Sequence, residues 1–159
     1  MKYPNASPTL TFTEAINRAA NNLLNINGRA RRSEFWWTKL VTFFLAMIFG
    51  FGILLYLLTI PLTVRRLHDT GRSGWWLLGS IILSVIFFGI ACYDLVALFI
   101  DASNGTFNNF GLFSLLMKYI VLTIVFIIYQ IIIIAFCCID SDPYPNKYGE
   151  SPKYSFDNE

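Results

Sequence analysis

The sequence predicts an all-α integral membrane protein, a helical bundle with three or four membrane segments and a short N-terminal amphipathic helix. Of the 159 residues, 55% are hydrophobic and 17% aromatic, and the mean hydropathy is +0.54. A soluble domain of this size is rarely so apolar. The basic residues gather beside long apolar runs, the pattern of a membrane protein, and the net charge is only +2. This distribution argues against nucleic acid as a partner. We expect residues 1–159 to form one membrane domain.

The first predicted element is an amphipathic helix at residues 11–25. Thr11 and Glu14 have the spacing of a capping box, in which each side chain binds an exposed backbone amide at the start of a helix. Apolar residues then recur at helical spacing at Ile16, Ala20, Leu23 and Leu24. Two interpretations stay open, a helix lying on the membrane surface and a helix packed on the rest of the protein.

A basic segment with an aromatic end precedes the first apolar run. Its arginines are Arg29, Arg31 and Arg32. Trp36 and Trp37 follow, and they suit the headgroup level because each ring is apolar and carries one N–H donor. We expect them to be interface anchors. Glu34 is expected to form a solvated ion pair with an arginine of this segment.

Residues 36–64 form the first predicted membrane segment, with no charged residue from Leu40 to Val64. The roughly 29 residues would reach about 43 Å as one helix, longer than a 30 Å hydrocarbon core but too short for two full spans. A tilted helix and a hairpin broken near Gly50–Gly52 are the two possibilities. The hairpin is favoured because basic residues flank the segment on both sides, which places both ends in the cytoplasm.

A polar motif loop at residues 65–76 separates this segment from the next. Its charged and polar residues include Arg65, Arg66, His68, Asp69, Arg72 and Ser73. Trp75 and Trp76 end the loop and are further candidate interface anchors. The positive-inside rule predicts that the N-terminus, this loop and the C-terminal tail are all cytoplasmic.

Two membrane helices follow at residues 77–100 and 112–139, joined by a loop at 101–111 that has no lysine or arginine. The absence of basic residues predicts that this loop is on the non-cytoplasmic side. Asp94 interrupts the first helix, and an acidic residue inside a span indicates a function or a buried partner. A structural role near the far end of the span is the favoured interpretation. A polar tail at 140–159 completes the chain.

No metal site or cofactor is predicted. The chain has one histidine and three cysteines. Cys92, Cys137 and Cys138 lie in apolar runs without the spacing of zinc ligands, so we interpret them as free buried thiols.

Three motifs together resemble one family. They are residues 28–36 (GRARRSEFW), residues 65–76 (RRLHDTGRSGWW) and residues 146–149 (NKYG) followed by Pro152. In this order they resemble the domain of unknown function 805 family of small bacterial inner-membrane proteins. The resemblance implies a four-span protein with cytoplasmic motif loops and no established activity. The stretch between the first two motifs is shorter here than in the family.

The leading functional hypothesis is an arginine-rich site at the cytoplasmic face that binds an anionic lipid headgroup or another phosphate-bearing ligand. Guanidinium groups offer forked donors that match phosphate. The proposed site residues are Arg29, Arg31, Arg32, Arg65, Arg66, His68, Asp69, Arg72 and Ser73. An equally weighted interpretation is that these residues pair with one another, with Asp69 holding an arginine and His68 contacting the tail near Tyr148.

Three other functions are weighed. The first is a scaffold or regulator that binds a protein partner or a second copy, through the tail tyrosines Tyr144, Tyr148 and Tyr154. The second is an enzyme using His68, which is disfavoured because no nucleophile with a partner stands out. The third is transport past Asp94, for which the spans hold few other polar residues.

Overall fold

The computed structural model describes residues 5–50, 52–106 and 109–155, without the side chains of residues 53, 109 and 110. The predicted segments also include residues 1–4, 51, 107–108 and 156–159, and those parts lie outside the described residues. The chain divides into two compact units. One comprises the residues up to Leu77 and from Ala135 onward, and the other comprises residues 78–134.

Helix α1 (Phe12–Asn21) begins at the predicted capping box. The Thr11 amide donates to Glu14 Oε2 (2.9 Å), and the Glu14 amide donates to Thr11 Oγ1 (3.4 Å). The helix is shorter than the predicted 11–25. It ends early because asparagine side chains at 22–27 bind nearby backbone and side-chain groups instead of continuing the helix.

The buried face of α1 differs from the predicted apolar face. Ala15 and Ala19 are buried, and α1 packs on helix α2 (Arg32–Phe49). Ala20 is exposed and Leu24 is 80% exposed. Small alanines let two helix backbones approach closely, so packing selects this stripe rather than the larger side chains.

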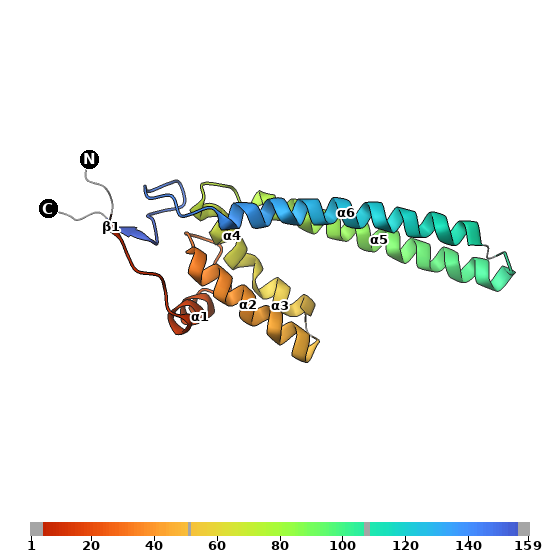
Figure 1. The fold of residues 1–159 in the computed structure, drawn as a ribbon, viewed down its shortest axis with the longest axis horizontal. Helices are drawn as coiled ribbons and strands as arrows, with labels where there is room; N and C mark the ends of the chain where they lie inside the picture. Colours follow the sequence, from red (N-terminus) through yellow and green to blue (C-terminus); the bar gives the residue numbers. More distant parts are fainter. Residues whose placement is uncertain (1–4, 51, 107–108, 156–159) are drawn as a thin grey trace. The chain divides into compact units, whose positions relative to one another are not determined.

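The chain folds back at Gly50 to form a helical hairpin (Figure 1). Gly50 caps α2 with φ of +70°, the left-handed conformation that glycine adopts readily. Helix α3 (Gly52–Leu58) packs along α2, and helix α4 (Ile60–Asp69) follows. A single straight helix over 36–64 is therefore wrong, and the break falls where the glycines predicted it. Placement of this hairpin in the bilayer stays a prediction.

The N-terminal segment pairs with the tail. Strand β1 (Asn5–Ala6) and strand β2 (Tyr154–Ser155) form an antiparallel ladder. The Ser7 amide extends it by donating to the Lys153 carbonyl (2.8 Å). Residues near the two described ends of the chain thus belong to one unit.

The second unit consists of most of helices α5 (Trp75–Asn104) and α6 (Asn109–Cys138), each of 30 residues. Both are long and apolar enough to cross a membrane, with mean hydropathies of 2.4 and 2.9 in their most apolar windows. Side-chain bonds of α6 to Ser80 and Asp94 join them as an antiparallel pair. The predicted loop at 101–111 was too long, because helical structure continues to Asn104 and resumes at Asn109.

Candidate functional site

The motifs meet at one buried carboxylate in the first unit. Asp69, at the end of α4, is fully buried. Its Oδ1 accepts from Arg29 Nε (2.9 Å), and its Oδ2 accepts from Arg66 Nη1 and from Ser141 Oγ (2.5 Å). We call Arg29, Arg66, Asp69 and Ser141 the Asp69 cluster. It joins the first motif, the motif loop and the tail.

The remaining donors of Arg29 bind backbone carbonyls. Nη2 donates to Asp69 O (3.2 Å) and Asp142 O (2.5 Å), and Nη1 donates to Tyr144 O (2.9 Å) and Gly149 O (3.3 Å). With the bond from Nε to Asp69, all five donors of this guanidinium are used inside the protein. Arg29 therefore fixes the tail against the end of α4.

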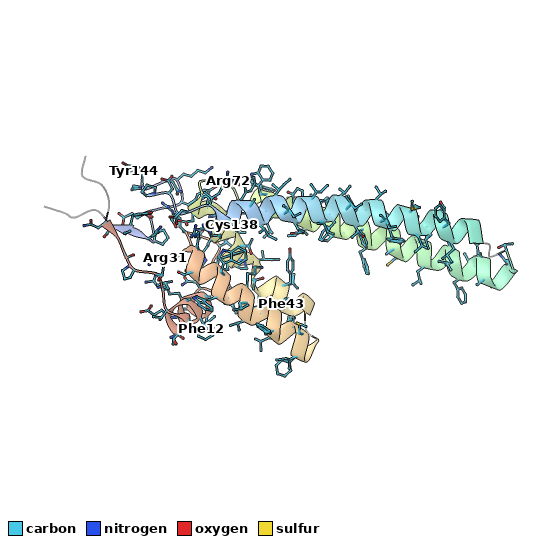
Figure 2. The ribbon with its side chains drawn as sticks, in the orientation of Figure 1. Phe12, Arg31, Phe43, Arg72, Cys138 and Tyr144 are labelled. Carbon is cyan, nitrogen blue, oxygen red and sulfur yellow. The ribbon has the colours of Figure 1, made fainter. Side chains whose placement is uncertain are left out.

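Two arginines satisfy the C-terminal end of helix α6. Arg66 donates to Cys137 O (3.0 Å) and to Ile139 O, and Arg32 donates to Cys138 O (3.2 Å). The last carbonyls of a helix have no partner within the helix and carry its negative dipole end, so cations there are stabilising. Arg66 also donates to Ala30 O (3.2 Å). In Figure 2 the label Arg31 marks the start of α2 and the label Cys138 marks the end of α6.

Arg65 and Arg31 bind other parts of the first unit. Arg65 Nη2 donates to Glu34 Oε1 (3.1 Å), and both side chains are about 5% exposed or less. The expected solvated pair within the first segment is wrong, because the partner comes from α4 and the pair is buried. Burial raises the pKa of Glu34, and Arg65 opposes this increase. Arg31 donates to Ser7 Oγ, Ser7 O and Pro8 O (2.8 to 3.1 Å).

His68 contacts the tail, as one interpretation of the sequence expected. Its ring stacks on Tyr148, with centroids 3.7 Å apart. Its Nδ1 lies 3.2 Å from Gly28 O, and its own carbonyl accepts from Asn146 Nδ2 (2.9 Å). Burial lowers the pKa of His68, while the contact with Gly28 opposes this decrease.

Within the described part of the chain, Arg72 and Ser73 bind groups outside the Asp69 cluster. Arg72 lies over the Phe136 ring (4.1 Å to the centroid) and donates to Thr70 O (3.3 Å). Ser73 Oγ accepts from the Trp75 amide at the start of α5 (3.4 Å). Contacts of six of the nine predicted site residues thus link the first motif, the motif loop and the start of the tail, whereas Arg31 binds the N-terminal segment and Arg72 and Ser73 lie at the start of α5.

The predicted interface anchors are all partly exposed. The exposed fractions are 41% for Trp36, 38% for Trp37, 75% for Trp75 and 41% for Trp76. Trp37 packs edge-on against Phe12 of α1 (5.4 Å between centroids). Their position at the membrane boundary stays a prediction.

Asp94 belongs to the second unit and is buried between two partners from α6. Its Oδ1 accepts from Lys118 Nζ (2.7 Å), and its Oδ2 accepts from Tyr119 Oη (3.0 Å). Near the other end of the pair, Gln130 Nε2 donates to Ser80 Oγ (2.6 Å). Both oxygens of Asp94 are therefore used to hold two helices together.

The cysteines match the sequence analysis in part. The three cysteines are free, but only Cys137 is buried, whereas Cys92 and Cys138 are exposed on their helices. Among the described residues no group of three histidine, cysteine or acidic side chains lies close enough to hold a metal ion.

Sequence reasoning missed Ser141 and the backbone carbonyls that bind the arginines. Ser141 had no recognisable signal. Asn146 and Gly149 did have one, because both belong to the third motif. Asn146 Oδ1 accepts from the Tyr148 amide (2.9 Å), and Gly149 has φ of +120°, so both shape the turn that positions Tyr148 against His68.

A family profile described as "Protein of unknown function (DUF805)" matches residues 41–150. The chain belongs to the DUF805 family. It is similar to "Inner membrane protein YhaH" of Escherichia coli K12, with 32% identity over 81 residues, covering 38% of this chain and 67% of that protein. It is also similar to "Inner membrane protein YhaI" of the same strain, with 37% identity over 73 residues, covering 36% of this chain and 62% of that protein. No solved structure matches.

The DUF805 match includes the motif loop, all of α5 and α6, and the first half of the tail. The Asp69 cluster therefore lies largely inside the matched region, with Arg29 just before it. The matched part of the chain covers about two thirds of YhaH and somewhat less of YhaI. The chain is thus a membrane protein of a family to which no activity has been assigned.

Proposed function

We propose that this protein is an inner-membrane scaffold whose buried arginines hold three motifs at the cytoplasmic face, and whose outer arginines Arg32 and Arg72 bind anionic lipid headgroups. The observation that carries the proposal is the division of the arginines. Of the six arginines in the first motif and the motif loop, four are nearly buried and donate to protein groups, whereas the Arg32 side chain is 50% exposed and Arg72 is partly exposed. Only the second kind has donors that a lipid phosphate can reach.

Contacts within the first unit support a single-sided arrangement of the motifs. The N-terminal segment pairs with the tail in the β1–β2 ladder, and Arg29 binds both Asp69 and the tail carbonyls. Segments in direct contact lie on the same side of a membrane. Because these segments hold most of the basic residues, the positive-inside rule assigns that side to the cytoplasm.

The returning arm of the α2–α3 hairpin is too short to cross the bilayer a second time. Helix α2 has 18 residues and α3 has 7. At 1.5 Å per residue these give about 27 Å and 10 Å, so the returning arm is too short to cross a 30 Å core. Large apolar side chains are exposed around the turn, including Met47 (70%), Ile48 (71%) and Phe49 (60%). A re-entrant hairpin would bury them in lipid and keep both ends cytoplasmic.

The outer arginines lie beside groups suited to a membrane boundary. Arg72 stacks on Phe136 and precedes Trp75, which is 75% exposed. The weak pairing of Arg32 with Asp140 (4.0 Å) leaves most of its donors open. Guanidinium donors beside exposed tryptophan match the phosphate level of a leaflet.

The test compares retained lipid after purification. The protein carrying Arg32→Gln and Arg72→Gln is purified from mild detergent, and bound phosphatidylglycerol is measured by native mass spectrometry. We expect fewer bound molecules than in the wild type. The matched control carries Arg18→Gln and Lys147→Gln, which remove the same charge from α1 and the tail. Equal lipid retention in both double variants would contradict specific headgroup binding.

The scaffold is proposed to act on lipid rather than through the tail tyrosines. Tyr148 stacks on His68, Tyr154 Oη donates to Asp140 Oδ2 (3.5 Å), and the backbone of Tyr144 accepts from Arg29 and donates to Asp142, so all three residues make contacts within the protein itself. A protein partner or a second copy stays a prediction from the sequence.

A further inference from the structure

The apolar side chains of helix α1 form two neighbouring stripes, and only one of them is buried. Ala15 and Ala19 are buried where α1 packs on α2. Phe12, Ile16 and Ala20 are each four residues apart, so they form a second stripe beside the first. Phe12 is 49% exposed, Ala20 is exposed and Ile16 is partly exposed. We call this second stripe the uncovered edge of α1.

The turn that follows α1 adds large apolar side chains to this edge. Leu23 comes three residues after Ala20, the spacing of neighbours on a helix face, and it is 41% exposed. Leu24 and Ile26 are 80% and 54% exposed. Single exposed apolar residues are ordinary, but a group of them marks an interaction surface.

The uncovered edge of α1 meets an exposed apolar face of α2. Trp37, Leu40 and Phe44 are three and four residues apart and therefore share one face of α2, where they are 38%, 45% and 54% exposed. Phe12 joins the two helices, because its ring lies edge-on against the Trp37 ring (5.4 Å between centroids). The exposed apolar surface therefore continues from α2 onto α1.

Helix α1 lies crosswise to the hairpin. In Figure 1 α1 is seen almost along its axis, whereas α2 and α3 run across the view. A helix that lies crosswise to a segment entering the bilayer runs along the membrane surface. Glu14 and Asn21 are exposed on the side of α1 away from the uncovered edge, so they would face water in this position.

We propose that the uncovered edge of α1 and the turn after it insert into the cytoplasmic leaflet, at the boundary between headgroups and acyl chains. The partner is the apolar part of the leaflet, because the edge continues the exposed face of the hairpin and holds no charged residue. The first motif follows this turn directly, so α1 would hold that motif at the membrane surface. The inference rests on the placement of the hairpin in lipid under the proposed function.

The chemistry of α1 separates this contact from headgroup binding by Arg32 and Arg72. The charged residues of α1 are Glu14 and Arg18, whose charges cancel. Interfacial helices bind through buried apolar area together with attraction to anionic lipids, and α1 offers only the first. Insertion of α1 should therefore not depend on anionic lipid.

The test measures which side of α1 meets lipid. Ala20→Cys, Asn21→Cys and Met47→Cys are made singly in a chain whose three natural cysteines are replaced by alanine, and each is labelled with the fluorophore NBD. Asn21 is the matched control, because it is exposed on the next position of the same helix. Met47, which is 70% exposed, reports on the hairpin. Quenching by iodide in water and by doxyl-labelled phosphatidylcholine is compared in phosphatidylcholine nanodiscs, with and without phosphatidylglycerol.

We expect doxyl lipid to quench the probes at Ala20 and Met47, and iodide to quench the probe at Asn21. Both results should be the same with and without phosphatidylglycerol. Adding Leu24→Ser and Ile26→Ser should reduce doxyl quenching at Ala20, because apolar area is lost from the edge. Adding Arg18→Gln instead should leave it unchanged, because that substitution alters only charge.

Four results would overturn the inference. Quenching by iodide at Ala20 with Met47 still in lipid would place the edge in water and leave the hairpin proposal standing. Quenching by iodide at both positions would reject the hairpin placement as well. Protection of Ala20 from both quenchers would show that protein, such as a second copy, covers the edge. Doxyl quenching that requires phosphatidylglycerol would assign the contact to headgroup charge.

Discussion

Replacing Asp69 by asparagine should remove most of the stability of the first unit. The substitution keeps the shape of the side chain but leaves Arg29 and Arg66 buried without their shared counter-charge. Removing one partner of a buried ion pair costs about 3–5 kcal/mol. For a chain of this size each 1 kcal/mol lowers Tm by about 2–4 °C, so we expect a decrease of about 6–20 °C.

Unfolding can be followed at Cys137, which is fully buried. With Cys92 and Cys138 replaced by serine, a thiol reagent should label Cys137 only when the first unit opens. The labelled fraction is measured against temperature in detergent. Asp142→Asn is the control, because the side chain of Asp142 accepts from the Tyr144 amide and asparagine can keep that bond. A similar transition in both variants would refute the role assigned to Asp69.

Three further predictions concern other contacts. Burial holds the pKa of His68 below its ordinary value of 6.5. Because the unfolded chain then binds the proton at a higher pH than the folded chain, stability should fall as the pH drops below about 6.5. His68→Phe should reduce this pH dependence in thermal melts. Ala15→Leu should cost about 1–3 kcal/mol by overpacking α1 on α2, whereas Ala20→Leu should stay within about 0.5 kcal/mol in the same denaturation assay. Asp94→Asn should loosen the α5–α6 pair, because it weakens the bond from Lys118. Amide hydrogen exchange in both helices should then be faster than in the control variant Lys118→Arg. Unchanged exchange would contradict the pairing.

The sequence predicted the elements whose signals are local. The capping box at Thr11 and Glu14 set the start of α1, and the glycine pair set the break after α2. Hydropathy located α5 and α6 but not all of their ends. The predicted end of α5 at residue 100 was too early, and the predicted start of α6 at residue 112 was too late. The end of α5 was missed because Asp101, Ser103 and Asn104 are polar yet continue the last turn of this helix.

The partners of the arginines were not predictable from residue types. The sequence indicated that the motifs gather and that Asp69 could hold an arginine, and the structure confirms a pair with Arg66. It did not indicate that carbonyls at the end of α6 and in the tail would accept from Arg29 and Arg66. Backbone acceptors are the same for every residue, so they leave no pattern in the sequence.

The face of α1 was mispredicted for a related reason. Large apolar residues such as Leu24 dominate a hydropathy pattern, but Ala15 and Ala19 form the contact with α2. Close packing depends on shape as well as hydrophobicity, and small residues at helical spacing are a weak signal in one sequence. The exposed Leu23 and Leu24 just after α1 are available to lipid if the helix lies on the membrane.

The topology of the motifs tests the account most directly. Cys92, Cys137 and Cys138 are replaced, single cysteines are placed at Ser33, Ser73, Asn104 and Ser151, and intact cells are treated with a membrane-impermeant thiol reagent. The account predicts that only the cysteine at Asn104 is labelled, because the Asp69 cluster holds the motifs and the tail on the cytoplasmic side. Labelling of the cysteine at Ser33 or Ser73, but not both, would place the two motifs on opposite sides and contradict the account.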